Sequence, residues 1–265
     1  MNPTGSRGDR NDAYWRDYLT RGSSAEHYGR LLFKRIPADP RCRLCAAPFE
    51  GVGAPVMRLI GKQRSNSNPH LCNACFVNLQ RHHGGAEVDG SLLFADIRGS
   101  TTLAESMSPG DFHELLDRFY MTAIKVVFDH DGAIDKFVGD ELVAIFFPLL
   151  SGERHAERAV EAAQALLRAT GHADPGGPWL PVGAGVNSGR IWFGAVGDGE
   201  HTELTALGDR VNVTARLAST AQAGEVLVTR EAASAAGLDP PLERLSLELK
   251  GKAEATEVVA LRVAP

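Results

Sequence analysis

Two Cys-x-x-Cys pairs constrain the first third of the chain more than any other feature. Cys42 and Cys45 form one pair, Cys72 and Cys75 form the other, and the surrounding stretch is rich in turn-forming residues but poor in core residues. Such a stretch needs a covalent or metal link to fold, and four thiolates complete a closed tetrahedral metal site. The sequence therefore predicts a small metal-stapled module, with zinc as the favoured ion and an iron–sulfur cluster as the alternative.

The string LCNACFVNL around the second pair resembles the second half of GATA-type treble-clef fingers. The longer spacer and the few basic residues after Cys75 depart from that family, so we expect no nucleic-acid partner. His70, His82 and His83 lie nearby in the sequence. Because four cysteines already fill a tetrahedral shell, we expect these histidines to be solvated.

Composition limits the class of protein. The chain has 265 residues, of which 43% are hydrophobic and 23% charged, so it can bury a real core. Its start lacks a signal-peptide pattern, and no window approaches the roughly 18 apolar residues of a membrane span. We therefore expect a cytoplasmic protein with no membrane partner, in which paired thiols bind metal and do not form disulfides.

Charge is distributed unevenly along the chain. Residues 1–84 carry 13 Lys or Arg against 6 Asp or Glu, a balance of +7, whereas the remainder, with 15 against 27, has −12. Two solvated surfaces, docking of one part on the other, or an anionic ligand for the first part would each explain this. Charge alone does not decide among them.

Changes in pattern divide the chain into three segments. Residues 1–36 form a partly ordered arm with at most a short helix over 12–20, residues 37–87 hold the cysteine module and a linker, and residues 88–265 form a second domain. In that domain a strand and a long helix over 109–130 precede two strands joined by a tight turn. Further helices and strands follow, so the pattern predicts an α+β fold with helices over one face of a sheet that contains antiparallel strands.

Two aspartates of the second domain are candidate metal ligands. Asp96 ends the apolar run SLLFADI, and Asp140 occupies the turn in FVGDEL. Each alone suits an ordinary turn or helix cap. Neighbouring strand ends can bring the two carboxylates together, and such a pair holds the two divalent ions that promote in-line displacement at phosphorus.

Five ordered strings closely resemble the catalytic domain of class III adenylate and guanylate cyclases over residues 88–263: FADIRGST, KFVGDELVAIFF, VGAGVNSG, TALGDRVNVTARL and LKGKAEATEV. The resemblance implies a ferredoxin-like cyclase sandwich in which Asp96 and Asp140 bind two Mg²⁺ or Mn²⁺ ions. It also implies that Asn212 orients the ribose and Arg216 stabilises charge on the α-phosphate. Their spacing of four on a predicted helix places both on one face.

The resemblance also implies a choice of base. Lys136 and Thr205 occupy the two purine-selecting positions, where guanylate cyclases carry Glu and Cys, so ATP is favoured over GTP. Lys250 or Lys252 resembles the phosphate-contacting lysine of the family.

The sequence thus predicts an adenylate cyclase that converts ATP to 3′,5′-cyclic AMP and pyrophosphate. Family resemblance implies a head-to-tail homodimer with shared sites, and we expect the cysteine module to regulate it. Three alternatives stay open: a guanylate cyclase, a non-catalytic metal-binding dimerisation module, and a diguanylate cyclase, in which Val138 would replace the first glycine of the signature.

Overall fold

The structure is a computed structural model that describes residues 7–22, 24–36, 40–66, 69–197, 202–238, 243–248 and 255–263. The chain divides into two compact units. The first, called the cysteine unit here, comprises Met1–Val88, Pro148–Leu150 and Trp192–Ala206. The second, called the sheet unit, comprises Asp89–Phe147, Ser151–Ile191 and Leu207–Pro265. The domain boundaries expected from the sequence stay a prediction.

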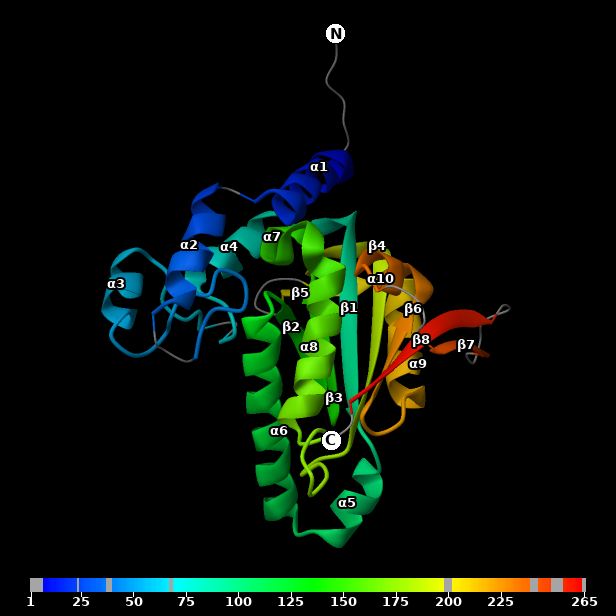
Figure 1. Ribbon diagram of the computed structural model, residues 1–265. Coiled ribbons are helices and arrows are strands. Elements are labelled where there is room, and N and C mark those ends of the chain that lie inside the picture. Colours follow the sequence, from blue (N-terminus) through cyan, green and yellow to red (C-terminus); the bar gives the residue numbers. More distant parts are fainter. Residues whose placement is uncertain are drawn as a thin grey trace. The chain divides into compact units, whose positions relative to one another are not determined.

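Four helices of the described chain precede the first strand: α1 (Arg7–Thr20), α2 (Ser24–Lys34), α3 (Ala54–Leu59) and α4 (Asn73–Arg81) (Figure 1). Helix α1 begins five residues before the short helix expected over residues 12–20. Its residues Trp15 and Leu19 are fully buried. The indole Nε1 of Trp15 donates a hydrogen bond to the His82 carbonyl at 2.6 Å. The Tyr14 ring stacks on the His82 ring with 3.7 Å between centroids. These contacts hold α1 to the end of α4.

The strands form one mixed sheet with the order β2-β3-β1-β4-β6-β8-β7, and β5 pairs with β4 beside this path. The strands are β1 (Gly84–Ile97), β2 (Ala133–Val138), β3 (Glu141–Phe146), β4 (Val182–Val196), β5 (Glu203–Leu207), β6 (Glu225–Thr229), β7 (Glu243–Leu247) and β8 (Thr256–Arg262). Strands β4 and β6 run parallel, whereas β1 with β3 and β2 with β3 run antiparallel. The expected α+β fold class is therefore confirmed.

The tight hairpin predicted between the two strands after the long helix is confirmed. Val138 pairs with Glu141 across it, and Gly139 in the turn has φ +60°. Only glycine takes this conformation without a steric cost, so the turn that carries Asp140 depends on Gly139. Strand β4 continues without interruption through Gly189, whose φ is +137°.

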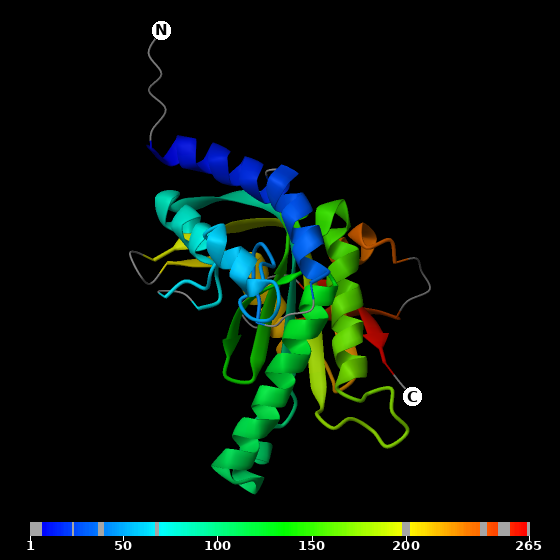
Figure 2. The same cartoon turned by 90° about the vertical axis from the view of Figure 1, so that its left-hand side faces the viewer.

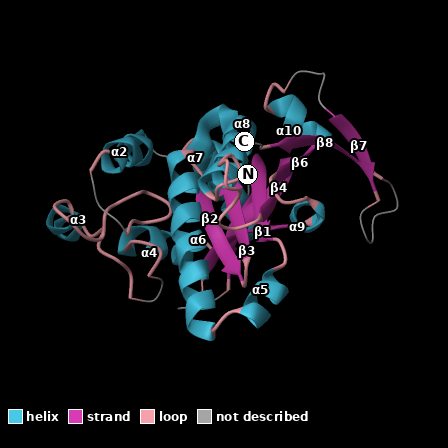
Figure 3. Cartoon of the chain, turned by 60° about the horizontal axis from the view of Figure 1, so that its bottom comes forward, coloured by secondary structure: helices cyan, strands magenta, loops and turns pink. Residues whose placement is uncertain are grey.

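Helices cover both faces of the sheet (Figures 1 and 3). Helices α6 (Pro109–Asp129), α8 (His155–Ala169) and α10 (Arg230–Ala235) share one hydrophobic core, and Figure 2 shows α6 and α8 side by side. Helix α9 (Asp209–Thr220) packs on the opposite face through Val213 and Leu217. Strand β6 serves both cores, because Val226 and Val228 face one and Leu227 faces the other. The expectation of helices on one face thus holds for three helices and is wrong for α9.

Three short helical segments complete the described chain: α5 (Ser100–Ser106), α7 (Pro148–Ser151) and a 3₁₀ turn (Gly152–Arg154). Helix α6 begins after Ser108, whose hydroxyl accepts a hydrogen bond from the Asp111 backbone N–H at 3.2 Å.

No helix in the described part of the chain is both long enough and apolar enough to span a membrane.

A buried histidine makes the stability of the sheet unit depend on pH. The Nε2 atom of His172 accepts a hydrogen bond from the Val182 N–H at 3.0 Å, and burial lowers the pKa of this imidazole. A lowered folded-state pKa means that the stability is present above the unfolded pKa of about 6.5 and is lost as pH falls below it.

We expect the melting temperature to fall between pH 7.5 and 5.5 and the His172→Gln variant to lose part of that dependence. His172→Ala leaves the Val182 N–H unpaired and should cost about 1–3 kcal/mol at pH 7.5. Thermal melts across this pH range measure both effects, with His113→Gln as the control, since the His113 side chain is 73% exposed. An unchanged pH profile in His172→Gln would contradict this assignment.

Candidate functional site

Asp96 and Asp140 come together at one end of the β1–β3 pair. Asp96 pairs in register with Glu141, the first residue of β3, and Asp140 precedes it in the hairpin turn. Asp140 lies close enough to Asp96 for its charge to act on the Asp96 carboxyl group. Burial raises the pKa of Asp96, the charge of Arg98 opposes this, and Asp140 raises it further. Two carboxylates held this closely favour a bound cation.

Glu141 is a third carboxylate in this group, which the sequence analysis missed. Burial, together with the charges of Asp96 and Asp140, raises the pKa of Glu141 to about 7. Its position directly after the Gly-Asp turn was the available signal. Carboxylate oxygens are the donors that Mg²⁺ and Mn²⁺ prefer. Three neighbouring carboxylates supply donors of this kind, so the residues fit the divalent ions expected from the sequence.

Arg98 also contacts this group and was not singled out from the sequence. Its Nη2 atom forms an ion pair with Oδ2 of Asp96, and both side chains are 22% exposed. Its Nη1 atom donates to the Ser219 carbonyl at 2.6 Å and lies 3.5 Å from the Ala221 carbonyl. The partners on α9 lie more than 120 residues away along the chain, so no local pattern indicates this contact.

The carboxylate group comprises Asp96, Asp140 and Glu141, and α9 carries the other expected catalytic residues. Asn212 is exposed and Arg216 is half-buried on that helix. Within the described residues, no hydrogen bond or ion pair joins either side chain to the two aspartates. One chain therefore holds both expected sets of residues without bringing them into contact.

The expected base-selecting residues lie on two strands. Lys136 is in β2, and its Nζ lies 3.7 Å from Oδ1 of Asp135. Thr205 is a buried residue of β5. Lys136 belongs to the sheet unit, whereas Thr205 belongs to the segment Trp192–Ala206 of the cysteine unit. The expected phosphate ligands Lys250 and Lys252 lie outside the described residues.

The four cysteines form a cluster in the cysteine unit. The Sγ atoms of Cys42, Cys45, Cys72 and Cys75 all lie within 4.8 Å of one another, and all four residues are buried. Those of Cys45 and Cys72 are 3.7 Å apart. The backbone N–H of Cys72 donates to Cys42 Sγ at 3.3 Å, as expected for thiolates held in turns. Helix α4 starts directly after Cys72, whose sulfur caps it through the N–H of Cys75.

Charge in this cluster is also unbalanced. Hydrogen bonds from neighbouring thiols hold the pKa of Cys45 and of Cys72 below the ordinary value, whereas burial raises that of Cys42. Burial lowers the pKa of Lys62, but the nearby thiolates outweigh it and raise the value. Four buried thiols with one neighbouring ammonium fit a divalent cation. Within the described residues, no histidine belongs to this cluster. Burial, followed by the charges of nearby arginines, lowers the pKa of His70 to about 4.

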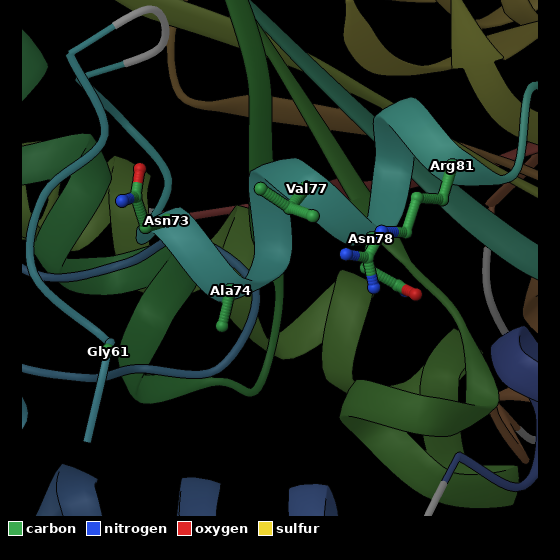
Figure 4. Close-up of a pocket in the computed structure, with 6 residues that line it drawn as sticks. All are labelled: Gly61, Asn73, Ala74, Val77, Asn78 and Arg81. Carbon is green, nitrogen blue, oxygen red and sulfur yellow. The ribbon is translucent and has the colours of Figure 1, made fainter.

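A separate hollow lies beside α4. It has a volume of about 380 Å³ and is lined by Gly61, Asn73, Ala74, Val77, Asn78 and Arg81 (Figure 4). The Asn78 side chain already accepts a hydrogen bond from the Tyr14 hydroxyl at 2.8 Å. The lining residues include one charged side chain and no carboxylate, so this hollow lacks the groups of a metal or catalytic site.

Comparison with known proteins finds similar chains among the cyclases. The chain is 33% identical over 177 residues to the terminal-differentiation-specific adenylate cyclase of Dictyostelium discoideum, covering 63% of this chain and 8% of that enzyme. It is 34% identical over 144 residues to adenylate cyclase 1 of Rhizobium meliloti, covering 51% of this chain and 22% of that enzyme. The chain thus spans a small part of these curated relatives.

Solved structures agree with this placement. The guanylyl cyclase Cya2 superposes with a TM-score of 0.60 at 26% identity, covering 68% of this chain and all of that one. The adenylyl cyclase CyaB from P. aeruginosa gives 0.58 at 27% identity, covering 66% of this chain and 94% of that one. The profile of the adenylate and guanylate cyclase catalytic domain matches residues 86–259. Because this match spans well over half of the 265 residues, the chain belongs to the adenylate and guanylate cyclase family.

Proposed function

We propose that this chain is an adenylate cyclase that converts ATP to 3′,5′-cyclic AMP and pyrophosphate. The observation that carries the proposal is that Asp96 and Asp140 lie at the same end of the β1–β3 pair, with Glu141 paired in register with Asp96. A cyclase fold whose acidic group had lost one aspartate would have no site for two divalent ions. Both aspartates are present here.

The proposed reaction is an in-line displacement at the α-phosphorus. The ribose 3′-oxygen forms a bond to that phosphorus and loses its proton, while the bond to the oxygen bridging the α- and β-phosphates breaks and pyrophosphate leaves. Asp96 and Asp140 would hold two Mg²⁺ or Mn²⁺ ions, whose positive charge would favour the ionised 3′-oxygen and the leaving pyrophosphate. Asn212 orients the ribose. Arg216 contributes a permanently charged guanidinium to the oxygens of the transition state.

Base selection is proposed to rest on Lys136 and Thr205. A lysine donor suits an acceptor nitrogen of adenine, and a threonine hydroxyl suits the exocyclic amine. Lys250 or Lys252 would contact phosphate. Similarity to the guanylyl cyclase Cya2 supports GTP as the second candidate substrate, and a direct comparison of the two nucleotides decides between them.

Asp96→Asn and Asp140→Asn should each lower cyclase activity at least about 100-fold, because each removes a charged metal ligand. Cyclic AMP and cyclic GMP formation from ATP and GTP, with Mg²⁺ or Mn²⁺, measures the effect. Asp129→Asn is the matched control, since this exposed carboxylate of α6 pairs only with Lys125 among the described contacts. Activity that survives both substitutions would contradict the metal assignment, and equal rates with GTP would contradict the choice of ATP.

The proposed active form is a head-to-tail homodimer with two shared sites. One chain keeps the aspartate pair apart from the Asn212–Arg216 face of α9, so a second copy is needed to bring the two sets together. Each site would take the aspartates from one chain and the α9 residues from its partner.

Mixing Asp96→Ala with Arg216→Ala, each inactive alone, should therefore restore activity. Random exchange makes half of the dimers mixed, and each has one intact site, so about a quarter of the wild-type activity is expected. Subunit exchange is verified with two affinity tags on the same mixture. No recovery in a mixture that has exchanged would exclude shared sites.

The cysteine unit is proposed to bind one zinc ion and to regulate the cyclase, with an iron–sulfur cluster as the alternative. We expect anaerobically purified protein to be colourless and to contain one zinc per chain. Cys45→Ala should lose that zinc and lower the melting temperature of the cysteine unit, because three thiolates no longer close the shell. Metal analysis with absorption spectra tests this. Visible absorption with bound iron and sulfide would replace zinc with a cluster.

A further inference from the structure

Arg98 connects two elements of the sheet unit that the proposed reaction uses separately. Its guanidinium pairs with Asp96 through Nη2, while Nη1 donates to the Ser219 carbonyl at 2.6 Å. The backbone N–H of Arg98 donates to the Pro181 carbonyl at 2.8 Å, which fixes the start of this side chain. A single planar group thus joins the acidic group to the C-terminal end of α9.

At α9 the guanidinium binds groups that the helix leaves unpaired. The last carbonyls of a helix lack intrahelical partners and carry partial negative charge, so a cation there is favourable. Ser219 lies in the last turn of α9 and Ala221 follows it. The Ser219 hydroxyl in turn donates to the Arg216 carbonyl at 3.0 Å. Arg98 therefore holds the end of the helix that carries Asn212 and Arg216.

At the acidic group Arg98 supplies positive charge. Its Nη2 atom forms an ion pair with Oδ2 of Asp96. A divalent ion on Asp96 would share this carboxylate with Arg98. Two cations at one carboxylate repel each other, so metal binding and the Arg98–Asp96 pair compete.

We propose that Arg98 is a positioning residue that couples metal binding at Asp96 to the position of α9. Without metal the guanidinium holds Asp96 and the end of α9 together, and metal binding shifts it away from Asp96. This inference rests on the proposed function. In the proposed dimer, the α9 residues of one chain belong to the site that contains the partner's aspartates. Through Arg98, metal binding at one site would therefore change the position of α9 at the other site.

The decisive signature is a split between metal affinity and rate. An arginine that only braced the fold would, when removed, weaken metal binding and lower the rate together. A competing cation behaves differently, because its removal frees the Asp96 carboxylate while it releases the end of α9. Metal affinity should therefore rise while the rate at saturating metal falls.

The experiment uses full-length, nucleotide-free protein titrated with Mn²⁺ and followed by electron paramagnetic resonance. Arg98→Gln should bind Mn²⁺ on the order of tenfold more tightly than wild type, and its kcat with saturating Mn²⁺ and ATP should fall. Mn²⁺ should change the rate of backbone hydrogen exchange over residues 209–221 in the wild type but not in Arg98→Gln. Arg98→Lys keeps the charge and should restore the wild-type Mn²⁺ affinity.

Arg168→Gln is the matched control, because Arg168 is an exposed arginine in the last turn of α8 and should change none of these measurements. Unchanged or weaker Mn²⁺ binding in a folded Arg98→Gln variant would overturn the coupling. If that variant does not fold, Arg98→Lys is measured in its place. Wild-type Mn²⁺ affinity with a smaller effect of Mn²⁺ on hydrogen exchange over residues 209–221 supports the proposal. Wild-type values for both quantities overturn it. Asp96→Asn separates the two hypotheses, since wild-type Mn²⁺ binding there would refute the metal site itself.

Discussion

Repulsion among three carboxylates is the constraint on which the sheet unit's site depends. Asp96, Asp140 and Glu141 gather at one end of the β1–β3 pair, where burial and mutual charge raise the pKa of Asp96 and of Glu141. Strand register places Asp96 opposite Glu141, so the sheet itself enforces this crowding. Positive charge must be supplied from elsewhere. Arg98 supplies part of it within the chain, and divalent ions would supply the rest.

The position of α9 follows from the same sheet. Strand β6 is buried on both faces, and Gly185 of β4 lets α9 approach closely, since a Cβ there would lie 2.6 Å from Leu217 Cβ. This packing fixes α9 on the face opposite the main core. The helix is therefore rigidly placed without reaching the aspartates of its own chain, and this is the geometry that a symmetric pair of chains can complete.

Short-range patterns predicted the hairpin and the long helix, because each depends on residues close in sequence. The Gly139 turn alone brings β2 and β3 together and sets Asp140 at their junction. The role of Arg98 was not predictable in this way, because its partner Ser219 lies 121 residues further along the chain. The face chosen by α9 was missed for a similar reason. The apolar stripe of a helix shows that the helix packs against something. The buried second face of β6 determines on which side of the sheet α9 packs.

The two candidate metal sites make different demands on the fold. The four cysteines are at most 6% exposed, so four thiolates without a cation would leave unneutralised charge in the interior. An ion bound at these cysteines would therefore be part of folding. The Asp96 side chain is 22% exposed and paired with Arg98, so folding of the sheet unit does not depend on an ion at this carboxylate. In the proposed enzyme, an ion at the cysteines would be a structural staple, whereas the ions at Asp96 and Asp140 would bind reversibly together with the substrate.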